Sequence, residues 1–286
     1  MKITPLASAL GAEVHGLDLS KRLENEQVAE IREAWLRHQV LLFRGQQLTP
    51  QQLIEFSGRF APLATHDNYP GELRHPDHSE LLVVKASKVR GERVIFGQQW
   101  HSDLSYTTRP SLGSSLYCLK LPPVGGDTLF ANMYLAWETL SPTLQRILEP
   151  LEAVHDLTNG GDYLRASRDR TEAALKRNPP VLQPVCRVHP ETGRKALFVS
   201  EWMCPRFEGM SSEESKGLLE YLFKHATRPE FCLRQKWRVG DLLMWDNRCT
   251  VHMALADYPT DAERELLRTS MVGTPSGRLV DEPPLA

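Results

Sequence analysis

Apolar residues recur along the chain with two periods, one typical of helices and the other of strands. From residue 25 to 39 they stand three or four positions apart, as at Val28, Ile31 and Trp35. This spacing places them on one side of a helix, while the residues between them are mostly charged or polar. The pattern therefore predicts an amphipathic helix whose apolar side packs against a core.

The first residues of two other segments also indicate helices. Thr49 is a good N-cap, and the proline and glutamine that follow suit the first helical turn, so residues 49–60 are predicted as a helix. Ser211 and Glu214 have the spacing of a capping box, in which each residue binds the backbone of the other. They predict a helix over residues 211–229.

Most other apolar residues gather in short runs that are rich in β-branched and aromatic side chains and bounded by Gly, Pro, Asp or Asn, as is typical of strands. The predicted strands cover residues 40–45, 80–87, 115–121, 127–133, 195–200, 231–237, 241–247 and 265–273. Many short strands with irregular connections favour an antiparallel barrel or double-sheet roll with flanking helices. A doubly wound sheet would require regular strand–helix alternation, which is absent.

Composition excludes some classes of protein but does not indicate an activity. The chain has 286 residues, a net charge of −2 and 41% hydrophobic residues, which is an ordinary globular composition. No basic field favours nucleic acid or an anionic membrane, and no apolar run is long enough to span a bilayer. The start does not resemble a signal peptide, and the five cysteines are widely spaced, so we expect a cytoplasmic protein with buried thiols.

No repeat or linker divides the chain, so we expect one domain over residues 1–286. The segment 157–182 is polar and poor in apolar periodicity. We interpret it as an insertion over one end of the fold.

Two histidines and one aspartate are the first candidates for chemistry. His101 and Asp103 stand two positions apart, and residues at that spacing on a strand project from the same face. They would offer an imidazole nitrogen and a carboxylate oxygen to one ion, with His252 as the best third ligand. This is the ligand set of non-haem Fe(II) oxygenases, although two histidines and a carboxylate also bind zinc in hydrolases.

Taken alone, a His-x-Asp pair is weak evidence, because an isolated histidine is more often simply hydrogen-bonded. His75 and Asp77 repeat the same pattern in a polar segment interrupted by proline. We interpret that second pair as part of a solvated loop and not as a metal site.

Further along the chain, three residues favour an oxygenase: Thr128, Arg264 and Arg268. Two glycines permit a tight turn just before Thr128, which opens a predicted strand. Arg264 and Arg268 lie four apart in a strand-like stretch, so we expect them to share a face. Arginine binds carboxylates through two parallel hydrogen bonds. Solvated edge charges are the alternative interpretation of these two arginines.

As a set, these motifs resemble the taurine dioxygenase/2,4-dichlorophenoxyacetate dioxygenase family (TauD/TfdA family) of Fe(II)- and 2-oxoglutarate-dependent enzymes. The matching pieces extend over nearly the whole chain and are ITPL…GAEVHGLDLS, RHQVLLFRGQQLTPQQ, WHSD, PPVGGDTLFANMY, HPETGRKALFVSE and MWDNRCTVHMALADYP…RELLRTSM. The loop between His252 and Arg264 is one residue longer than in taurine dioxygenase.

The resemblance implies a double-stranded β-helix, that is a jelly roll like that of the cupins, and a set of roles. The iron ligands would be His101, Asp103 and His252, and Thr128 and Arg264 would hold the distal carboxylate of 2-oxoglutarate. Arg268 would lie near both the metal-bound carboxylate and the substrate anion. The reaction would consume 2-oxoglutarate and O2, release succinate and CO2, and hydroxylate a substrate carbon. Because Asp103 is retained, halogenation is not expected.

Substrate-binding residues are predicted from the same resemblance. His66 and Tyr69 match residues that bind the taurine end of the site, and Leu104, Tyr106 and Trp245 would line the pocket by position. Plain loop or core roles are the alternatives for all of them.

Gly97 and Gly161 stand where taurine dioxygenase has larger side chains, which would leave room for a longer or aromatic substrate. We therefore expect a small organic anion: a sulfonate such as taurine, an alkyl sulfate or an aryloxyalkanoate. Hydroxylation beside sulfur or an ether oxygen would fragment the product.

Three other functions stay open from the sequence. One is a biosynthetic hydroxylase of an amino-acid-like or carrier-bound substrate. The others are a zinc hydrolase and a non-catalytic binding protein on the same fold. Relatives of this kind are commonly oligomers, so a homodimer or homotetramer is expected.

Overall fold

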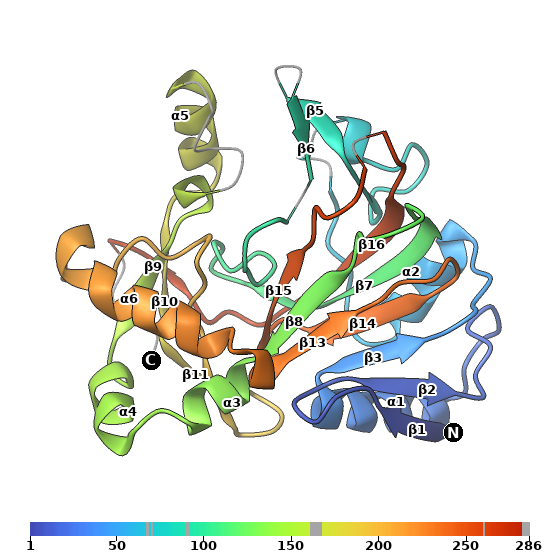
Figure 1. The fold of residues 1–286 in the computed structure, drawn as a ribbon, viewed down its shortest axis with the longest axis horizontal. Helices are drawn as coiled ribbons and strands as arrows, with labels where there is room; N and C mark the ends of the chain where they lie inside the picture. Colours follow the sequence, from blue (N-terminus) through green and yellow to red (C-terminus); the bar gives the residue numbers. More distant parts are fainter. Residues whose placement is uncertain are drawn as a thin grey trace.

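β-Sheets form the centre of the fold, and the largest sheet has seven strands (Figure 1). The computed structural model describes residues 1–66, 69, 71–89, 92–95, 97–160, 168–259 and 261–281. In spatial order the large sheet contains β1 (Lys2–Pro5), β2 (Ala12–His15), β3 (Val40–Phe43), β14 (Leu242–Asp246), β7 (Ser111–Lys120), β16 (Glu265–Val272) and β4 (Leu82–Lys85). Neighbouring strands are antiparallel except β2 and β3. The predicted strands at 40–45, 80–87, 115–121, 241–247 and 265–273 are thereby confirmed.

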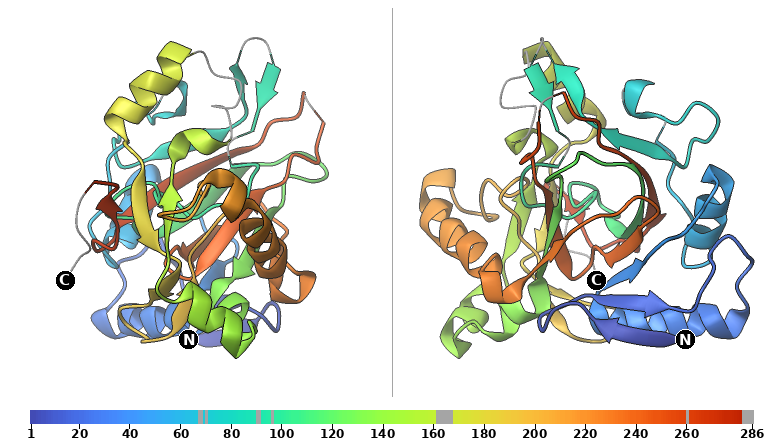
Figure 2. Two further views of the ribbon diagram at one scale, coloured as in Figure 1. Left: turned by 90° about the vertical axis from the view of Figure 1, so that its left-hand side faces the viewer. Right: turned by 45° about the vertical axis from the view of Figure 1, so that its right-hand side comes forward.

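A three-stranded sheet faces the large one (Figure 2). It consists of β13 (Cys232–Gln235), β8 (Thr128–Asn132) and β15 (Thr250–Ala254), all antiparallel. Two facing antiparallel sheets with helices outside form the predicted jelly roll. Strand β15 was not among the predicted strands, because only a tight turn separates it from β14.

Helices α1 (Asn25–His38) and α2 (Pro50–Gly58) pack on the outer face of the large sheet. Thr49 caps α2 through its side chain and forms the expected capping box with Gln52. Trp35 of α1 is completely buried, and a Cβ at Gly113 of β7 would lie 2.5 Å from its ring. Helix and sheet therefore approach so closely that only glycine fits at position 113.

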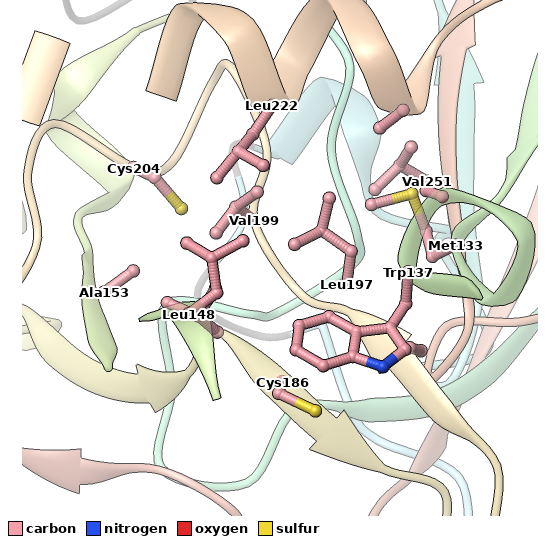
Figure 3. Close-up of a cluster of buried hydrophobic side chains, with 14 of the residues drawn as sticks. Met133, Trp137, Leu148, Ala153, Cys186, Leu197, Val199, Cys204, Leu222 and Val251 are labelled. Atoms are coloured by element: carbon pink, nitrogen blue, oxygen red, sulfur yellow. The ribbon is translucent and has the colours of Figure 1, made fainter. Parts of the chain in front are cut away.

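A second hydrophobic core lies beside the three-stranded sheet, and it joins α3 (Met133–Glu138) to α6 (Ser212–Ala226) (Figure 3). Ser211 and Glu214 form the predicted capping box of α6. Two helices in this layer were not predicted, α3 and α4 (Pro142–Leu148). They have six and seven residues, which is too short for a helical period to be recognised, and their caps, Asn132 and Ser141, are their clearest signal.

The remaining elements are short. They are η1 (Gly71–Leu73), β5 (Ser87–Val89), β6 (Glu92–Val94), β9 (Glu152–His155), η2 (Leu157–Asn159), α5 (Arg168–Arg177), β10 (Val181–Pro184), β11 (Cys186–Val188), β12 (Lys195–Leu197), η4 (Pro229–Phe231) and β17 (Arg278–Leu279). The segment 157–182, predicted as an insertion, contains η2, α5 and the start of β10. The strand predicted over 195–200 ends earlier, at Leu197. Among the described helices, none has the length and apolar character needed to cross a membrane.

Candidate active site

His101, Asp103 and His252 meet between the two sheets, and all three are buried. His252 lies in β15, and its backbone forms an isolated bridge with His101, with N–H to oxygen distances of 2.8 and 3.1 Å. Oδ1 of Asp103 lies 3.8 Å from Nε2 of His101 and 3.9 Å from Nε2 of His252. The prediction that these residues would come together is confirmed.

The predicted reason for the convergence is wrong. His101 makes only a single bridge, and Asp103 begins a turn rather than continuing a strand. Leu104, the next residue, has a φ of 56°, a left-handed conformation that a leucine rarely adopts. The sharp turn, and not strand alternation, directs the Asp103 carboxylate toward the two imidazoles.

Burial and neighbouring charge favour neutral imidazoles and an ionised carboxylate at this site. Nδ1 of His101 lies 2.7 Å from the carbonyl oxygen of Gln99, so Nδ1 carries the hydrogen and Nε2 keeps a lone pair. Burial lowers the pKa of His101 and of His252, which keeps both rings neutral. Burial alone would raise the pKa of Asp103, but the adjacent Arg268 guanidinium holds that pKa well below its usual value. Two neutral imidazoles and a carboxylate suit a divalent metal ion.

Sequence reasoning missed two residues that hold Asp103. Ser114 of β7 donates to Oδ2 of Asp103 at 2.7 Å, and Asn247, in the turn after β14, accepts from the Asp103 N–H at 3.2 Å. Neither residue type indicates metal chemistry by itself, and both lie far from Asp103 in the sequence. Only their places in the two sheets could have identified them.

Arg264 lies at one edge of the site, beside Thr128 at the start of β8. Its Nε donates to the carbonyl oxygen of Gly126 at 2.8 Å, and Nη2 lies 3.4 Å from Oγ1 of Thr128. Among the residues that the structure describes, no carboxylate lies within ion-pairing distance of this buried guanidinium. Gly126 has a φ of +75°, and a Cβ there would lie 3.1 Å from Cδ of Arg264. The predicted glycine turn therefore shapes the space around Arg264.

Arg268 is also buried, so neither arginine is a solvated edge charge. Nη1 of Arg268 donates to Oδ1 of Asp103 at 2.9 Å. Arg264 precedes β16, and a register shift between Glu265 and Leu266 interrupts the strand alternation. The four-residue spacing therefore did not establish a common strand face, although both arginines lie at the site.

The predicted substrate residues have different surroundings. His66 is buried and packs edge-on against Tyr69, with ring centroids 5.3 Å apart. Burial alone would lower the pKa of Arg268, but Asp103 and Tyr69 raise it, Tyr69 partly through a hydrogen bond, so Tyr69 reaches the same arginine. A Cβ at Gly97 would lie 3.1 Å from Cε1 of His101, so this glycine keeps space beside the ring.

The other residues predicted to line the substrate pocket differ in burial. Leu104 and Tyr106 are half-buried in the turn after Asp103, whereas Trp245 is fully buried core. Gly161 lies outside the described residues. His75 and Asp77 join no metal-ligating cluster among the described side chains, and Asp77 is exposed, as expected of a loop.

A second buried cluster resembles a metal site in composition: His189, Asp246 and Cys249. Arg248, however, donates to both oxygens of Asp246 at 2.8 and 2.6 Å. His189 Nδ1 accepts two backbone N–H groups, so Nε2 carries the hydrogen and donates to Asp246 at 3.0 Å. Because the carboxylate is already saturated, we interpret this cluster as structural.

Comparisons with known proteins match nearly the whole chain to one family. The family model described as "Taurine catabolism dioxygenase TauD, TfdA family" matches residues 2–270. The chain is 36% identical to the alpha-ketoglutarate-dependent 2,4-dichlorophenoxyacetate dioxygenase of Cupriavidus pinatubonensis over 277 residues, which cover 93% of this chain and 96% of the relative. It is 33% identical to the alkylsulfatase of Acinetobacter baylyi over 282 residues, which cover 96% and 85%.

A solved structure has the same overall fold. The crystal structure of a taurine dioxygenase from Burkholderia xenovorans superposes with a TM-score of 0.82 and 36% sequence identity. The match covers 96% of this chain and 89% of the other.

Proposed function

Because the chain belongs to the TauD/TfdA dioxygenase family, we propose that it is an Fe(II)- and 2-oxoglutarate-dependent dioxygenase that hydroxylates a small organic anion. The observation that carries the proposal is the juxtaposition of two sites. A buried His-Asp-His set lies near the buried Arg264, which has no carboxylate partner among the described residues. Thr128, which Arg264 contacts, pairs with Ala254 of β15, two residues after His252. The His-Asp-His set suits a metal ion, and Arg264 suits the anionic end of a co-substrate.

His101, Asp103 and His252 would hold Fe(II). Their ligand atoms all lie within 4.8 Å of one another, the Asp103 carboxylate supplies a negative charge, and Nε2 of His101 supplies a lone pair. Three protein ligands leave positions open for a chelating 2-oxoacid and for O2. Bound there, iron supplies the activation of O2 that couples loss of CO2 from 2-oxoglutarate to hydroxylation of the substrate.

Arg264 and Thr128 would bind the distal carboxylate of 2-oxoglutarate. A buried cation without a counter-ion is costly, so a carboxylate beside Arg264 would be strongly stabilised. Oγ1 of Thr128 already accepts from Nε1 of Trp237 at 3.0 Å and lies 3.4 Å from Nη2 of Arg264. Its hydroxyl hydrogen is therefore available to donate to the same carboxylate.

Arg268, His66 and Tyr69 would bind the anionic group of the substrate, and Leu104 would contribute an apolar wall. Arg268 donates to Asp103 through Nη1, and its guanidinium, which has five N–H donors in all, also interacts with Tyr69. The relatives named above act on an aryloxyalkanoate and on alkyl sulfates, and the similar solved structure is a taurine dioxygenase. A sulfonate, an alkyl sulfate or an aryloxyalkanoate is accordingly the proposed substrate class, with fragmentation of the hydroxylated product.

Succinate formation tests this proposal. Purified protein is supplied with Fe(II), ascorbate, O2 and 2-oxoglutarate, and the panel contains taurine, longer sulfonates, alkyl sulfates, phenoxyalkanoates and amino acids. Succinate coupled to one anion class supports the proposal, and N-oxalylglycine should inhibit. Coupling only to an amino acid would indicate a biosynthetic hydroxylase instead.

The matched control is His252→Ala, which removes one proposed ligand. It should abolish 2-oxoglutarate turnover while the protein stays folded. Full activity in this variant would contradict the proposed iron site, and so would the absence of succinate from folded, iron-loaded wild type. Either result would favour a zinc hydrolase or a non-catalytic binding protein. Cytoplasmic location and a homodimer or homotetramer stay predictions.

A further inference from the structure

Asn247 is completely buried in the turn between β14 and β15, and its side chain connects three parts of the active site. Its Oδ1 accepts from the backbone N–H of Asp103 at 3.2 Å and from Nε1 of Trp245 at 2.9 Å. Its Nδ2 donates to Oγ of Ser111 at 3.2 Å and of Ser114 at 3.1 Å, and lies 3.5 Å from Oδ2 of Asp103. The amide therefore uses its full hydrogen-bonding capacity around one carboxylate.

The directions of these hydrogen bonds are fixed by chemistry. Ser114 has one hydroxyl hydrogen, and it donates that hydrogen to Oδ2 of Asp103 at 2.7 Å. Its oxygen must then accept from Nδ2 of Asn247. Two consecutive hydrogen bonds therefore link the Asn247 side chain to the Asp103 carboxylate through Ser114. They add to the hydrogen bond between Asn247 and the Asp103 backbone.

The two oxygens of Asp103 consequently have separate tasks. Oδ2 is held by Ser114 and faces Asn247. Oδ1 accepts from Nη1 of Arg268 at 2.9 Å and is the oxygen nearest the Nε2 atoms of His101 and His252. A carboxylate oxygen has two lone pairs, so Oδ1 keeps one for a metal ion while it binds Arg268.

We propose that Asn247 and Ser114 are positioning residues that restrict Asp103 to binding the metal through Oδ1 alone. This inference rests on the function proposed above. If Oδ2 could turn inward, the carboxylate would bind through both oxygens and occupy one more coordination position. That position is needed for the co-substrate or for O2, because three single-atom ligands leave only three places open on an octahedral ion.

The turn that carries Asn247 is itself held by several buried contacts. Oγ of Ser102 donates to the carbonyl oxygen of Asn247 at 2.7 Å, which joins the turn to the His101–Asp103 segment. On either side of Asn247, Asp246 and Arg248 form the buried ion pair described above. Contacts of its own backbone and of the two adjacent residues therefore hold Asn247 in place. A residue that orients a metal ligand must itself be fixed in this way.

Ser114→Ala and Asn247→Asp test the proposal, and Ser115→Ala is the matched control. Ser115 is the next residue of β7, is equally buried, and its hydroxyl has no hydrogen-bond partner among the described residues. Asn247→Asp keeps the volume but removes both N–H donors. The readouts are the Kd for Co(II) of the metal-stripped protein and the visible absorption spectrum of the Co(II) complex, which reports coordination.

Ser114→Ala and Asn247→Asp should weaken Co(II) binding about 10- to 100-fold, as is usual for residues that orient metal ligands, and should shift the Co(II) bands. Ser115→Ala should match wild type in both. A merely structural role would change thermal stability without moving the Co(II) spectrum of the folded protein.

The outcomes separate the two proposals. If wild type binds Co(II) but folded Ser114→Ala has the Kd and spectrum of Ser115→Ala, the positioning role is refuted and the metal site survives. If wild type binds no divalent metal, the proposed function itself fails. Should Asn247→Asp not fold, Ser114→Ala still decides, because it removes a single hydroxyl from the same chain of hydrogen bonds.

Discussion

At the scale of single residues, the most informative feature is Arg264, a buried arginine that has no carboxylate partner among the described residues. Arg264 is buried, and burial lowers its pKa, yet among the residues that the structure describes its hydrogen bonds go only to neutral oxygens of Gly126 and Thr128. A protein tolerates such an arrangement where a ligand completes it. Arg268 differs because Asp103 neutralises it directly. The two arginines thus have separate tasks, although the sequence presents them as a pair.

Arg264→Gln should raise the KM for 2-oxoglutarate by about 10- to 100-fold, since a hydrogen bond between charged groups contributes about 1.5–3 kcal/mol. Thr128→Val, which loses only a hydroxyl, should raise it several-fold. Titration of 2-oxoglutarate at saturating primary substrate measures both. An unchanged KM in Arg264→Gln would remove Arg264 from the proposed co-substrate site.

Burial of His155 should make the free energy of unfolding depend on pH. Burial lowers its pKa to about 3, well below the value near 6.5 of an unfolded chain. Between these two values only the unfolded state binds the proton, so stability is fully present above about pH 6.5 and falls as the pH decreases toward 3. The slope from this one group is at most about 1.4 kcal/mol per pH unit.

The corresponding test is denaturant unfolding of wild type and His155→Gln at several pH values from 7 to 4.5. The variant should start less stable but lose less stability per pH unit than wild type. Parallel slopes would show that His155 is not the group responsible. His101 and His252 are buried in the same sense and contribute to the slope of both proteins, so the difference isolates His155.

At the scale of elements, the tight turn before β8 is the part on which the proposed co-substrate site depends. Gly125 and Gly126 have φ values of +80° and +75°, which residues with a side chain rarely adopt. A Cβ at Gly126 would also contact the Arg264 side chain at 3.1–3.2 Å. Backbone conformation and ligand-binding geometry are therefore linked at one position.

Gly126→Ala should cost about 1–3 kcal/mol through backbone strain and should also raise the KM for 2-oxoglutarate. Gly193→Ala is the matched control, since Gly193 has a φ of +69° but no atom within 4 Å of its would-be Cβ. Both variants should unfold at lower denaturant concentration, whereas only Gly126→Ala should change KM. Equal KM values for the two would argue that Arg264 adapts freely.

At the scale of the whole molecule, a series of ion pairs connects the outer helix α1 to the turn that carries Asn247, partly exposed at Arg32 and Glu191 and buried at Arg248 and Asp246. Arg32 of α1 pairs with Glu191 at 2.8 Å, Glu191 with Arg248 at 2.5 Å, and Arg248 with Asp246 at 2.6 Å. His189 completes the set from the segment after β11. Elements distant in the sequence thus stabilise one turn beside the active site.

The chain should therefore bind one divalent metal ion and not two, although two clusters contain suitable residues. Metal content per chain after loading and dialysis, measured by mass spectrometry, should be about one for wild type and for His189→Ala. It should be close to zero for His252→Ala. His189→Ala is expected to lower thermal stability, because it leaves Asp246 with one hydrogen bond fewer. A second bound equivalent lost in His189→Ala would show that the second cluster binds metal.

The sequence by itself determined the class of fold and the identity of the main candidate residues. Helices with strong caps, such as those that begin at Thr49 and Ser211, and apolar strands are decided locally, by hydrogen bonds and side-chain spacing within a few residues. The His-x-Asp motif and Arg264 could be selected because they occur within a set of motifs that together resemble one enzyme family, although each alone has commoner explanations. The extent of a single domain over residues 1–286 stays a prediction.

Only the tertiary structure decided how these residues act together. It showed that a turn at Leu104, and not a strand, directs Asp103 toward the histidines. It also showed that a register shift at the start of β16 lies between Arg264 and Arg268. It also identified Ser114 and Asn247, which lie 11 and 144 residues from Asp103. Contacts between elements that are distant in the chain depend on how the two sheets face each other, and no local pattern encodes that arrangement.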